Sequence, residues 1–357
     1  MKAARFYGPG DLRVEETEAP SAGPGEVVIA VVRAGICGTD LHDYVGPVKS
    51  VPMDEPHPLT GHKAPVIMGH ELSGYISEIG DDVENIKIGD RVTIMPVQSC
   101  FKCYYCRRGL YHLCKYQAGT GLQWKWGGFA DFLLVKDYMI RKIPDNMTYE
   151  QGALVEPTAL AVYALERGNF KAGQTVFISG GGPTATLTLL CAKAFGAGAV
   201  YMSEVQPGRL KRLKALGADE VFDPRDRDAM DQRIAELTDV GVDLAIECSG
   251  SEGGINDCFR LLRKRGMYVQ SGLAVGDIKV QPWEWALKDL NMCGIWAWDT
   301  NSFDQVIKII SNGMIPVEKL VSRTIQLDDI VSEGFDVLAF DKEGRELKIQ
   351  VVIREDT

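Results

Sequence analysis

The sequence predicts an α/β protein in which a β-rich part precedes a doubly wound parallel sheet. Up to about residue 150, short apolar runs such as Val27–Val32 and Phe132–Val135 are separated by Gly, Pro and Asp. From Thr175 onward, strand-like and helix-like runs alternate. The tail Lys348–Ile353 again resembles a strand, so the chain is expected to return to its first part at the end. With 357 residues, two domains of ordinary size are possible.

Within the second part, each predicted strand is followed by a predicted helix. The order of these runs is strand Val176–Ile178, helix Leu187–Phe195, strand Ala199–Met202, helix Arg209–Leu216 and strand Val242–Ile246. Such a βαβα order is typical of a parallel sheet covered by helices.

Composition excludes several classes of partner. The net charge is −10 and the pI is about 5.2, whereas nucleic acids and anionic membranes are bound by basic surfaces. Residues Met1–Glu16 lack the apolar core of an export signal, and no run approaches the ~18 apolar residues of a membrane span. Nine cysteines, several of them isolated, suit a reducing compartment. We therefore expect a cytoplasmic protein.

The most specific motif is a cluster of four cysteines in fifteen residues. It reads C-x2-C-x2-C-x7-C and consists of Cys100, Cys103, Cys106 and Cys114. Four thiolates at this spacing are typical of a closed, tetrahedral, structural zinc site. An iron–sulfur cluster is disfavoured because the last gap is seven residues and Lys115, not proline, follows. A disulfide framework is disfavoured in a long chain without an export signal. A zinc ion closed in by four thiolates performs no chemistry, so catalysis is expected elsewhere.

A second motif indicates a dinucleotide site. Gly180, Gly182 and Ala185 match G-x-G-x-x-G/A directly after a predicted strand. The first glycine permits a tight turn, the second lets the backbone approach a pyrophosphate, and the small third residue lets helix pack on strand. Pro183 suits the first helical turn, and with Thr184 it belongs to the expected phosphate-binding segment. The motif alone is weak and also describes ordinary glycine turns.

Glu204 strengthens the dinucleotide interpretation. It follows the next predicted strand, 24 residues after Gly180, where a carboxylate accepts the ribose hydroxyls of NAD and repels the extra phosphate of NADP. A solvated loop charge is the alternative. Arg209 is expected to contribute to cofactor binding, and with Lys211 it leaves NADP open.

Several stretches together resemble the zinc-dependent medium-chain alcohol/polyol dehydrogenases. They are the four-cysteine lobe, Gly35–His42, Gly69–Glu71, Gly89–Val92 and Glu156–Pro157, in matching order over essentially the whole chain. The resemblance implies a GroES-like β-rich catalytic domain at 1–156, completed by 296–357. It also implies a Rossmann NAD-binding domain at 157–295, with two zinc ions and one NAD per chain.

The resemblance also implies a second, catalytic zinc. Singly, its candidate ligands could be a buried thiol, a core imidazole and surface acids. Carried over by position, Cys37, His70 and Glu156 bind this zinc, and Glu71 is a nearby carboxylate that can approach it. Glu156 replaces the second cysteine of alcohol dehydrogenases, as in the sorbitol and butanediol branch. Asp40 is expected to orient His70.

Thr39 and His42 stand where the family has a proton relay, although His42 could also be a plain loop histidine. The excursion Val51–Gly61 resembles the (R,R)-2,3-butanediol (acetoin) dehydrogenase branch. The expected reaction is hydride transfer between NAD and a small vicinal diol, with sorbitol-, other polyol- or threonine-type oxidation as the alternatives. A non-catalytic, crystallin-like nucleotide-binding member is a further alternative. A homodimer or homotetramer is expected.

Two threonines depart from the family pattern, and one tryptophan leaves a choice open. Thr184 and Thr186 replace apolar residues at the start of the cofactor-facing helix, where their hydroxyls either contact the pyrophosphate or cap the helix. Trp296 either narrows the substrate site or fills the core between the domains.

Overall fold

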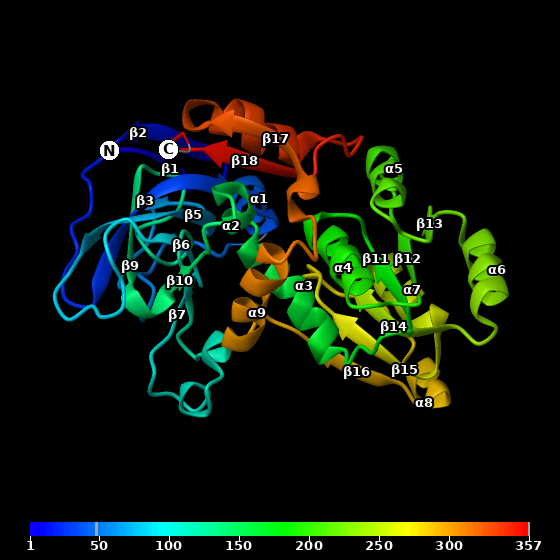
Figure 1. Ribbon diagram of the computed structural model, residues 1–357. Coiled ribbons are helices and arrows are strands. Elements are labelled where there is room, and N and C mark those ends of the chain that lie inside the picture. Colours follow the sequence, from blue (N-terminus) through cyan, green and yellow to red (C-terminus); the bar gives the residue numbers. More distant parts are fainter. Residues whose placement is uncertain (47–48, 356–357) are drawn as a thin grey trace.

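A β-rich body and a parallel-sheet body lie side by side in the computed structural model, which describes residues 1–46 and 49–355 (Figure 1). The central sheet of the β-rich body has the order β10-β6-β5-β3-β18-β17, and β9 pairs with β3. These strands are β3 (Glu26–Gly35), β5 (Glu71–Ile79), β6 (Arg91–Ile94), β9 (Phe132–Lys136), β10 (Ile140–Lys142), β17 (Val321–Gln326) and β18 (Lys348–Val352). The predicted strands Val27–Val32 and Phe132–Val135 are confirmed within β3 and β9.

Two smaller sheets complete this body. One contains β1 (Lys2–Gly8), β2 (Asp11–Glu16) and β4 (Val66–Ile67), and the other contains β7 (Val97–Gln98) and β8 (Ala118–Gly119). The helices are α1 (Gly38–Val45), α2 (Tyr149–Ala153) and α10 (Asp336–Phe340).

The chain returns to the β-rich body at its end, as the sequence predicted. Strand β18 pairs antiparallel with β3 and parallel with β17. Figure 1 shows β17, in orange, and β18, in red, beside the blue N-terminal strands. Because the chain returns here, the start of β18 lies beside the segment that follows β3, which contains the candidate metal ligand Cys37.

The second body contains one parallel sheet of order β13-β12-β11-β14-β15-β16. Its strands are β11 (Thr175–Ser179), β12 (Ala199–Ser203), β13 (Glu220–Phe222), β14 (Val242–Glu247), β15 (Leu262–Gln270) and β16 (Asn291–Gly294). The strand order reverses at β11, between β12 and β14. In open α/β sheets, ligands bind at the carboxyl ends of the strands at such a reversal.

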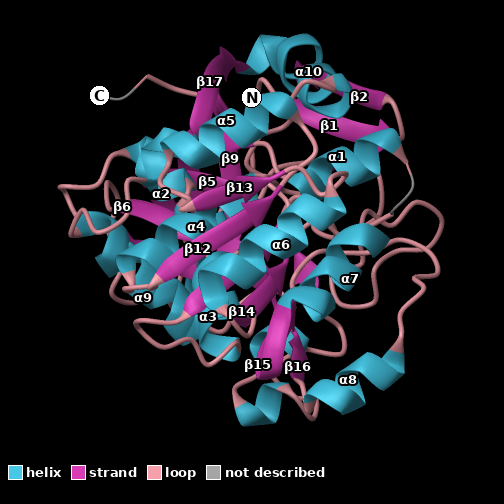
Figure 2. Ribbon diagram, turned by 90° about the vertical axis from the view of Figure 1, so that its right-hand side faces the viewer, coloured by secondary structure: helices cyan, strands magenta, loops and turns pink. Residues whose placement is uncertain are grey.

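Helices cover both faces of this sheet. They are α4 (Pro183–Ala194), α5 (Pro207–Ala215), α6 (Arg227–Thr238), α7 (Glu252–Leu261) and α8 (Pro282–Lys288). Val176 and Ile178 pack with residues of α4, whereas Phe177 packs with residues of α6 and α7. Because successive side chains of a strand point to opposite faces, α4 lies on one face and α6 and α7 on the other. Figure 2 shows these helices around the strands. Helix α4 starts four residues before the predicted Leu187, because Pro183 already occupies the first helical position.

The two bodies share an apolar core around helix α3 (Val155–Arg167), which packs against α4 and α9 (Thr300–Ser311). This core joins Val32 and Tyr149 of the β-rich body to Leu187 and Val200 of the parallel-sheet body. Within the described ranges, no helix is both long and apolar enough to cross a membrane.

Candidate active site

Cys37 and Asp40 are set in place by the turn between β3 and α1. Cys37 caps the N-terminus of α1, and its backbone N–H donates to Asp40 Oδ2 at 2.9 Å. Asp40 is fully buried, and its other oxygen, Oδ1, lies 3.5 Å from His70 Nδ1. The predicted pairing of Asp40 with His70 is therefore present as a contact.

Three donor atoms converge between the strand ends. Cys37 Sγ, a ring nitrogen of His70 and a carboxylate oxygen of Glu71 all lie within 4.8 Å of one another. Burial alone would lower the pKa of His70, but Asp40 and Cys37 outweigh burial and raise it well above 6.5. A sulfur, an imidazole nitrogen and a carboxylate form a donor set that suits zinc.

Glu71 has a buried partner that sequence reasoning missed. Lys348 Nζ donates to both carboxylate oxygens of Glu71 at 2.7 Å and to the carbonyl oxygen of Ile36 at 2.9 Å. Both side chains are only 1% exposed. Burial by itself would lower the pKa of Lys348, but Glu71 outweighs burial and raises it. Lys348 thus holds Glu71 at the edge of the cluster. Its only signal in the sequence was a charged residue at the start of a mostly apolar strand.

Glu156 faces the same place from helix α3. It is buried in the first turn, and its carboxylate has no hydrogen-bond partner within the described residues. Burial raises the pKa of Glu156 to about 8, and the neighbouring acid Glu71 adds to this rise. A buried acid without a partner is costly unless a cation compensates it. Cys37 and His70 therefore fit two ligands of a zinc ion; an oxygen of Glu71 lies within 4.8 Å of both, and Glu156 lines the same cavity as a candidate third ligand, which leaves one position for substrate.

These side chains line a cavity of about 470 Å³ between the two bodies. The predicted site residues in its wall are Cys37, Thr39, His42, His70, Glu71, Glu156, Gly182, Pro183, Thr184 and Ala185. Thr39 and His42 lie one turn apart on α1, so they share a helix face. Thr39 is half-buried and His42 is exposed. The pair thus extends from the cavity towards solvent, as a proton relay requires.

A second cavity of about 950 Å³ adjoins the first at Gly182 and contains Gly180, Glu204 and Arg209 in its wall. Gly180 has φ +97°, a left-handed conformation that favours glycine. A Cβ atom at Gly182 would have no neighbour closer than 4.0 Å, so the backbone there faces open space at the N-terminus of α4. Backbone N–H groups at such a helix start suit a pyrophosphate.

Glu204 directly follows β12 and is almost fully buried. Its Oε1 accepts hydrogen bonds from the backbone N–H groups of Val205 and Gln206 at 2.6 and 2.9 Å. Arg209 lies 3.9 Å from Oε2. A Cβ on Gly181 would stand 2.7 Å from Oε2, so Gly181 is needed for Glu204 to lie here. Sequence reasoning missed this role of Gly181, although the run of three glycines was its signal.

The two threonines at the start of α4 differ in environment. Thr186 is fully buried, and its hydroxyl donates to the carbonyl oxygen of Gly181 at 3.4 Å. Thr184 lines the cavity and accepts a hydrogen bond from Thr188 through its carbonyl oxygen. Of the two, Thr184 is therefore the one placed to meet a cofactor.

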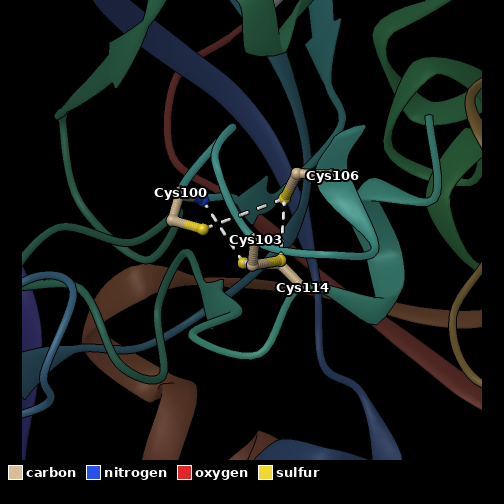
Figure 3. Close-up of side chains that lie close together, drawn as sticks. All are labelled: Cys100, Cys103, Cys106 and Cys114. Carbon is tan, nitrogen blue, oxygen red and sulfur yellow. Dashed lines mark hydrogen bonds between the residues drawn. The ribbon is translucent and has the colours of Figure 1, made fainter. Parts of the chain in front are cut away.

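The four cysteine side chains point toward one another in a lobe of the β-rich body (Figure 3). The sulfur of Cys103 lies 3.5 Å from that of Cys106 and 4.0 Å from that of Cys114, and the Cys100 and Cys106 sulfurs are 4.0 Å apart. A tetrahedron of Zn–S bonds of about 2.3 Å has S···S edges of about 3.8 Å. These distances are far longer than a disulfide bond, and all four cysteines are free. The lobe therefore fits a structural zinc.

The lobe also contacts helix α3. His112, between the third and fourth cysteines, is buried, and its Nε2 lies 3.3 Å from the hydroxyl of Tyr163. Tyr163 stands two turns after Glu156 on α3. One buried hydrogen bond thus connects the cysteine lobe to the helix that supplies Glu156.

Two family models match the chain. The model described as alcohol dehydrogenase GroES-like domain matches residues 23–145, and the model described as zinc-binding dehydrogenase matches residues 183–312. The chain is also 38% identical to the (R,R)-butanediol dehydrogenase of Bacillus subtilis, over 98% of this chain and 99% of that protein. It is 34% identical to the enzyme of the same name from Neisseria gonorrhoeae, over 96% and 97%. The chain therefore belongs to the zinc-binding alcohol dehydrogenases, and it is an oxidoreductase.

Solved structures agree with this assignment. The crystal structure of 2R,3R-butanediol dehydrogenase from Bacillus subtilis has a TM-score of 0.92 at 37% identity, covering 99% of each chain. A zinc-binding dehydrogenase from Sinorhizobium meliloti, bound to NADP, has a TM-score of 0.89 at 29% identity, again over 99% of both chains. An alcohol dehydrogenase from Escherichia coli complexed with NADH has a TM-score of 0.87 at 26% identity and 99% coverage of both. The predicted family and fold class, a GroES-like domain plus a Rossmann domain, are confirmed.

Proposed function

We propose that this enzyme interconverts a small vicinal diol and its hydroxyketone, of the 2,3-butanediol/acetoin type, with NAD as the hydride acceptor. The observation that carries the proposal is the cavity in which Cys37, His70 and Glu156 face the N-terminus of α4. The names of the most similar relatives support the substrate class. The carboxylate of Glu204 supports NAD over NADP.

When bound, a zinc ion would act as a Lewis acid that lowers the pKa of a substrate hydroxyl, and the nicotinamide of NAD would accept the hydride. The side chains of this protein would hold and orient these two groups. Cys37, His70 and Glu156, which line one cavity, would hold the catalytic zinc, and Glu71 lies within 4.8 Å of Cys37 and His70 but is anchored by Lys348. Asp40 Oδ1, 3.5 Å from His70 Nδ1, would orient the ring of His70, since a carboxylate beside one ring nitrogen sets the orientation of the other.

Alcohol oxidation releases a proton, and the cavity needs a route for it. The Thr39 hydroxyl would accept the proton inside the cavity, and the exposed His42 imidazole would pass it to solvent. Cys100, Cys103, Cys106 and Cys114 would hold the structural zinc, at a distance from this chemistry.

Steady-state kinetics test the proposal. The substrates are the three stereoisomers of 2,3-butanediol, sorbitol and threonine, each with NAD and with NADP. We expect the highest kcat/KM for (R,R)-2,3-butanediol with NAD. A higher value for sorbitol or threonine would assign the enzyme to another branch of the family.

We further propose the division into a catalytic domain (1–156 and 296–357) and a cofactor domain (157–295). The sheets support it, because β17 and β18 join the first body and β11–β16 form the second. Nine free cysteines support a reducing compartment such as the cytoplasm.

A homo-oligomer is proposed from the edge of the parallel sheet. Strand β16 is the last strand in the sheet order and is largely exposed; Met292 on this strand and Trp283 and Leu287 on the preceding helix α8 are exposed apolar side chains. An open edge of this kind is a ready surface for pairing with a second copy. Light scattering of Met292→Glu should then give a smaller species than the parent protein. A monomeric parent protein would contradict the proposal.

A further inference from the structure

Gln117 and Trp296 meet across the cavity that contains the candidate metal ligands. Gln117 precedes β8 in the β-rich body, and Trp296 follows β16 in the parallel-sheet body. The indole Nε1 of Trp296 donates to Oε1 of Gln117 at 2.7 Å, and both residues line the cavity wall. Trp296 is 48% exposed, so it lines the cavity and does not fill the core between the domains.

This hydrogen bond shows that the amide oxygen of Gln117 faces Trp296 and that the amide nitrogen is the free end. An indole N–H can only donate, so the atom that it contacts must be the amide oxygen. The Nε2 group of Gln117 then keeps two N–H donors, and it has no hydrogen-bond partner within residues 1–46 and 49–355. Gln123, the other glutamine of the wall, is different, because it accepts from Gly119 N and donates to the carbonyl oxygen of Ser50.

The remaining polar groups of the wall are occupied or inaccessible. Lys348 is held by Glu71, and the Ser50 side chain interacts with Asp43. The hydroxyls of Thr120 and Ser271 and the indole N–H of Trp298 are buried beneath the surface, with no exposed area to offer a ligand. Among the wall residues that the structure describes, and apart from the proposed relay, the metal site and Thr184 at the cofactor helix, Gln117 is the polar side chain left to meet a substrate.

We propose that Gln117 is a specificity-determining residue, whose amide N–H donates to the second oxygen of a vicinal diol while Trp296 holds the amide in this orientation. The inference rests on the proposed function and extends it. In butanediol and in acetoin alike, the non-reacting carbon carries a hydroxyl, whose oxygen can accept this hydrogen bond. A monoalcohol has no such oxygen and would leave the donor unpaired. A site that hydrogen-bonds a substrate hydroxyl therefore favours diols over monoalcohols, because a monoalcohol leaves the donor unpaired.

The test compares 2,3-butanediol with 2-butanol in the zinc-loaded full-length enzyme with NAD. For Gln117→Leu, the ratio of kcat/KM for the diol to kcat/KM for the monoalcohol should fall about tenfold, the effect of one hydrogen bond. Trp296→Phe keeps a ring but releases the amide, so the ratio should fall by a smaller factor of about three. Both variants are checked for zinc content and melting temperature.

The outcomes separate the two proposals. A parent enzyme that oxidises 2-butanol but not the diol would overturn the proposed function and, with it, this inference. If the parent enzyme prefers the diol and Gln117→Leu slows both substrates equally, Gln117 acts only on the structure and the inference alone fails. Should Gln117→Leu not fold, an unchanged ratio in Trp296→Phe decides against the inference.

Discussion

Lys348 and Glu71 form a fully buried ion pair between residues 277 positions apart, with Lys348 Nζ 2.7 Å from each carboxylate oxygen. The pair joins the last strand of the chain to β5, directly after the candidate ligand His70. The C-terminal return of the chain therefore does more than complete a sheet, because it supplies the cation that compensates an acid beside the metal ligands.

Removing one partner of this pair should destabilise the protein strongly. Lys348→Met leaves the charge of Glu71 buried and unpaired, so the free energy of unfolding should fall by about 3–5 kcal/mol. Urea denaturation measures it. The matched control is the double variant Lys348→Met with Glu71→Gln, in which neither charge of the pair remains and much of the stability should return. Equal stability of the single variant and the parent protein would contradict the role of the pair.

Loss of Cys37 should remove activity but not the fold. In Cys37→Ser, kcat/KM should fall by more than about a hundredfold, since even residues that only support a metal ligand cause losses up to that size. Zinc content should fall from near two to near one per chain. Cys293→Ser, which changes a thiol outside both clusters, is the control and should keep both ions. Comparable turnover in Cys37→Ser would refute the assignment of this ligand.

Loss of Cys103 should lower the stability of the protein, whereas loss of Cys37 should lower its activity. Cys103→Ser opens the tetrahedron of sulfurs, so the lobe loses its zinc and the melting temperature should fall by about 5 °C or more. The hydrogen bond between His112 and Tyr163 should also weaken, because the lobe positions His112. Calorimetry with and without a chelator measures the effect. A chelator that lowers the melting point of the parent protein as far as that of the variant would support the site, and unchanged melting of the variant would oppose it.

Glu204 should set the choice of cofactor. In Glu204→Ala, the carboxylate that binds the ribose hydroxyls and repels a phosphate is gone, so the ratio of kcat/KM for NAD to that for NADP should fall at least about tenfold. Arg209 lies 3.9 Å from Glu204 and would then face the phosphate. Adding Arg209→Ala to this variant should remove the gained activity with NADP. An unaltered ratio in Glu204→Ala would exclude Glu204 from this role.

The sequence by itself determined the parts of this protein that depend on local spacing. The cysteine lobe, the glycine turn before α4 and the alternating strands and helices are all short-range patterns, and each is present in the structure, with α4 starting four residues earlier than predicted. Family resemblance added Cys37, His70 and Glu156, which the fold brings to one cavity from the turn between β3 and α1, the residue before β5, and helix α3.

Only the tertiary structure decided the contacts between distant segments. Lys348 with Glu71, Gln117 with Trp296 and His112 with Tyr163 are pairs whose members are far apart in the chain. No local pattern marks such pairs, because their free energy depends on burial and on the packing of the two bodies. Helix propensity and the alternation of side chains along a strand are local properties, so they do not show which distant residues will meet.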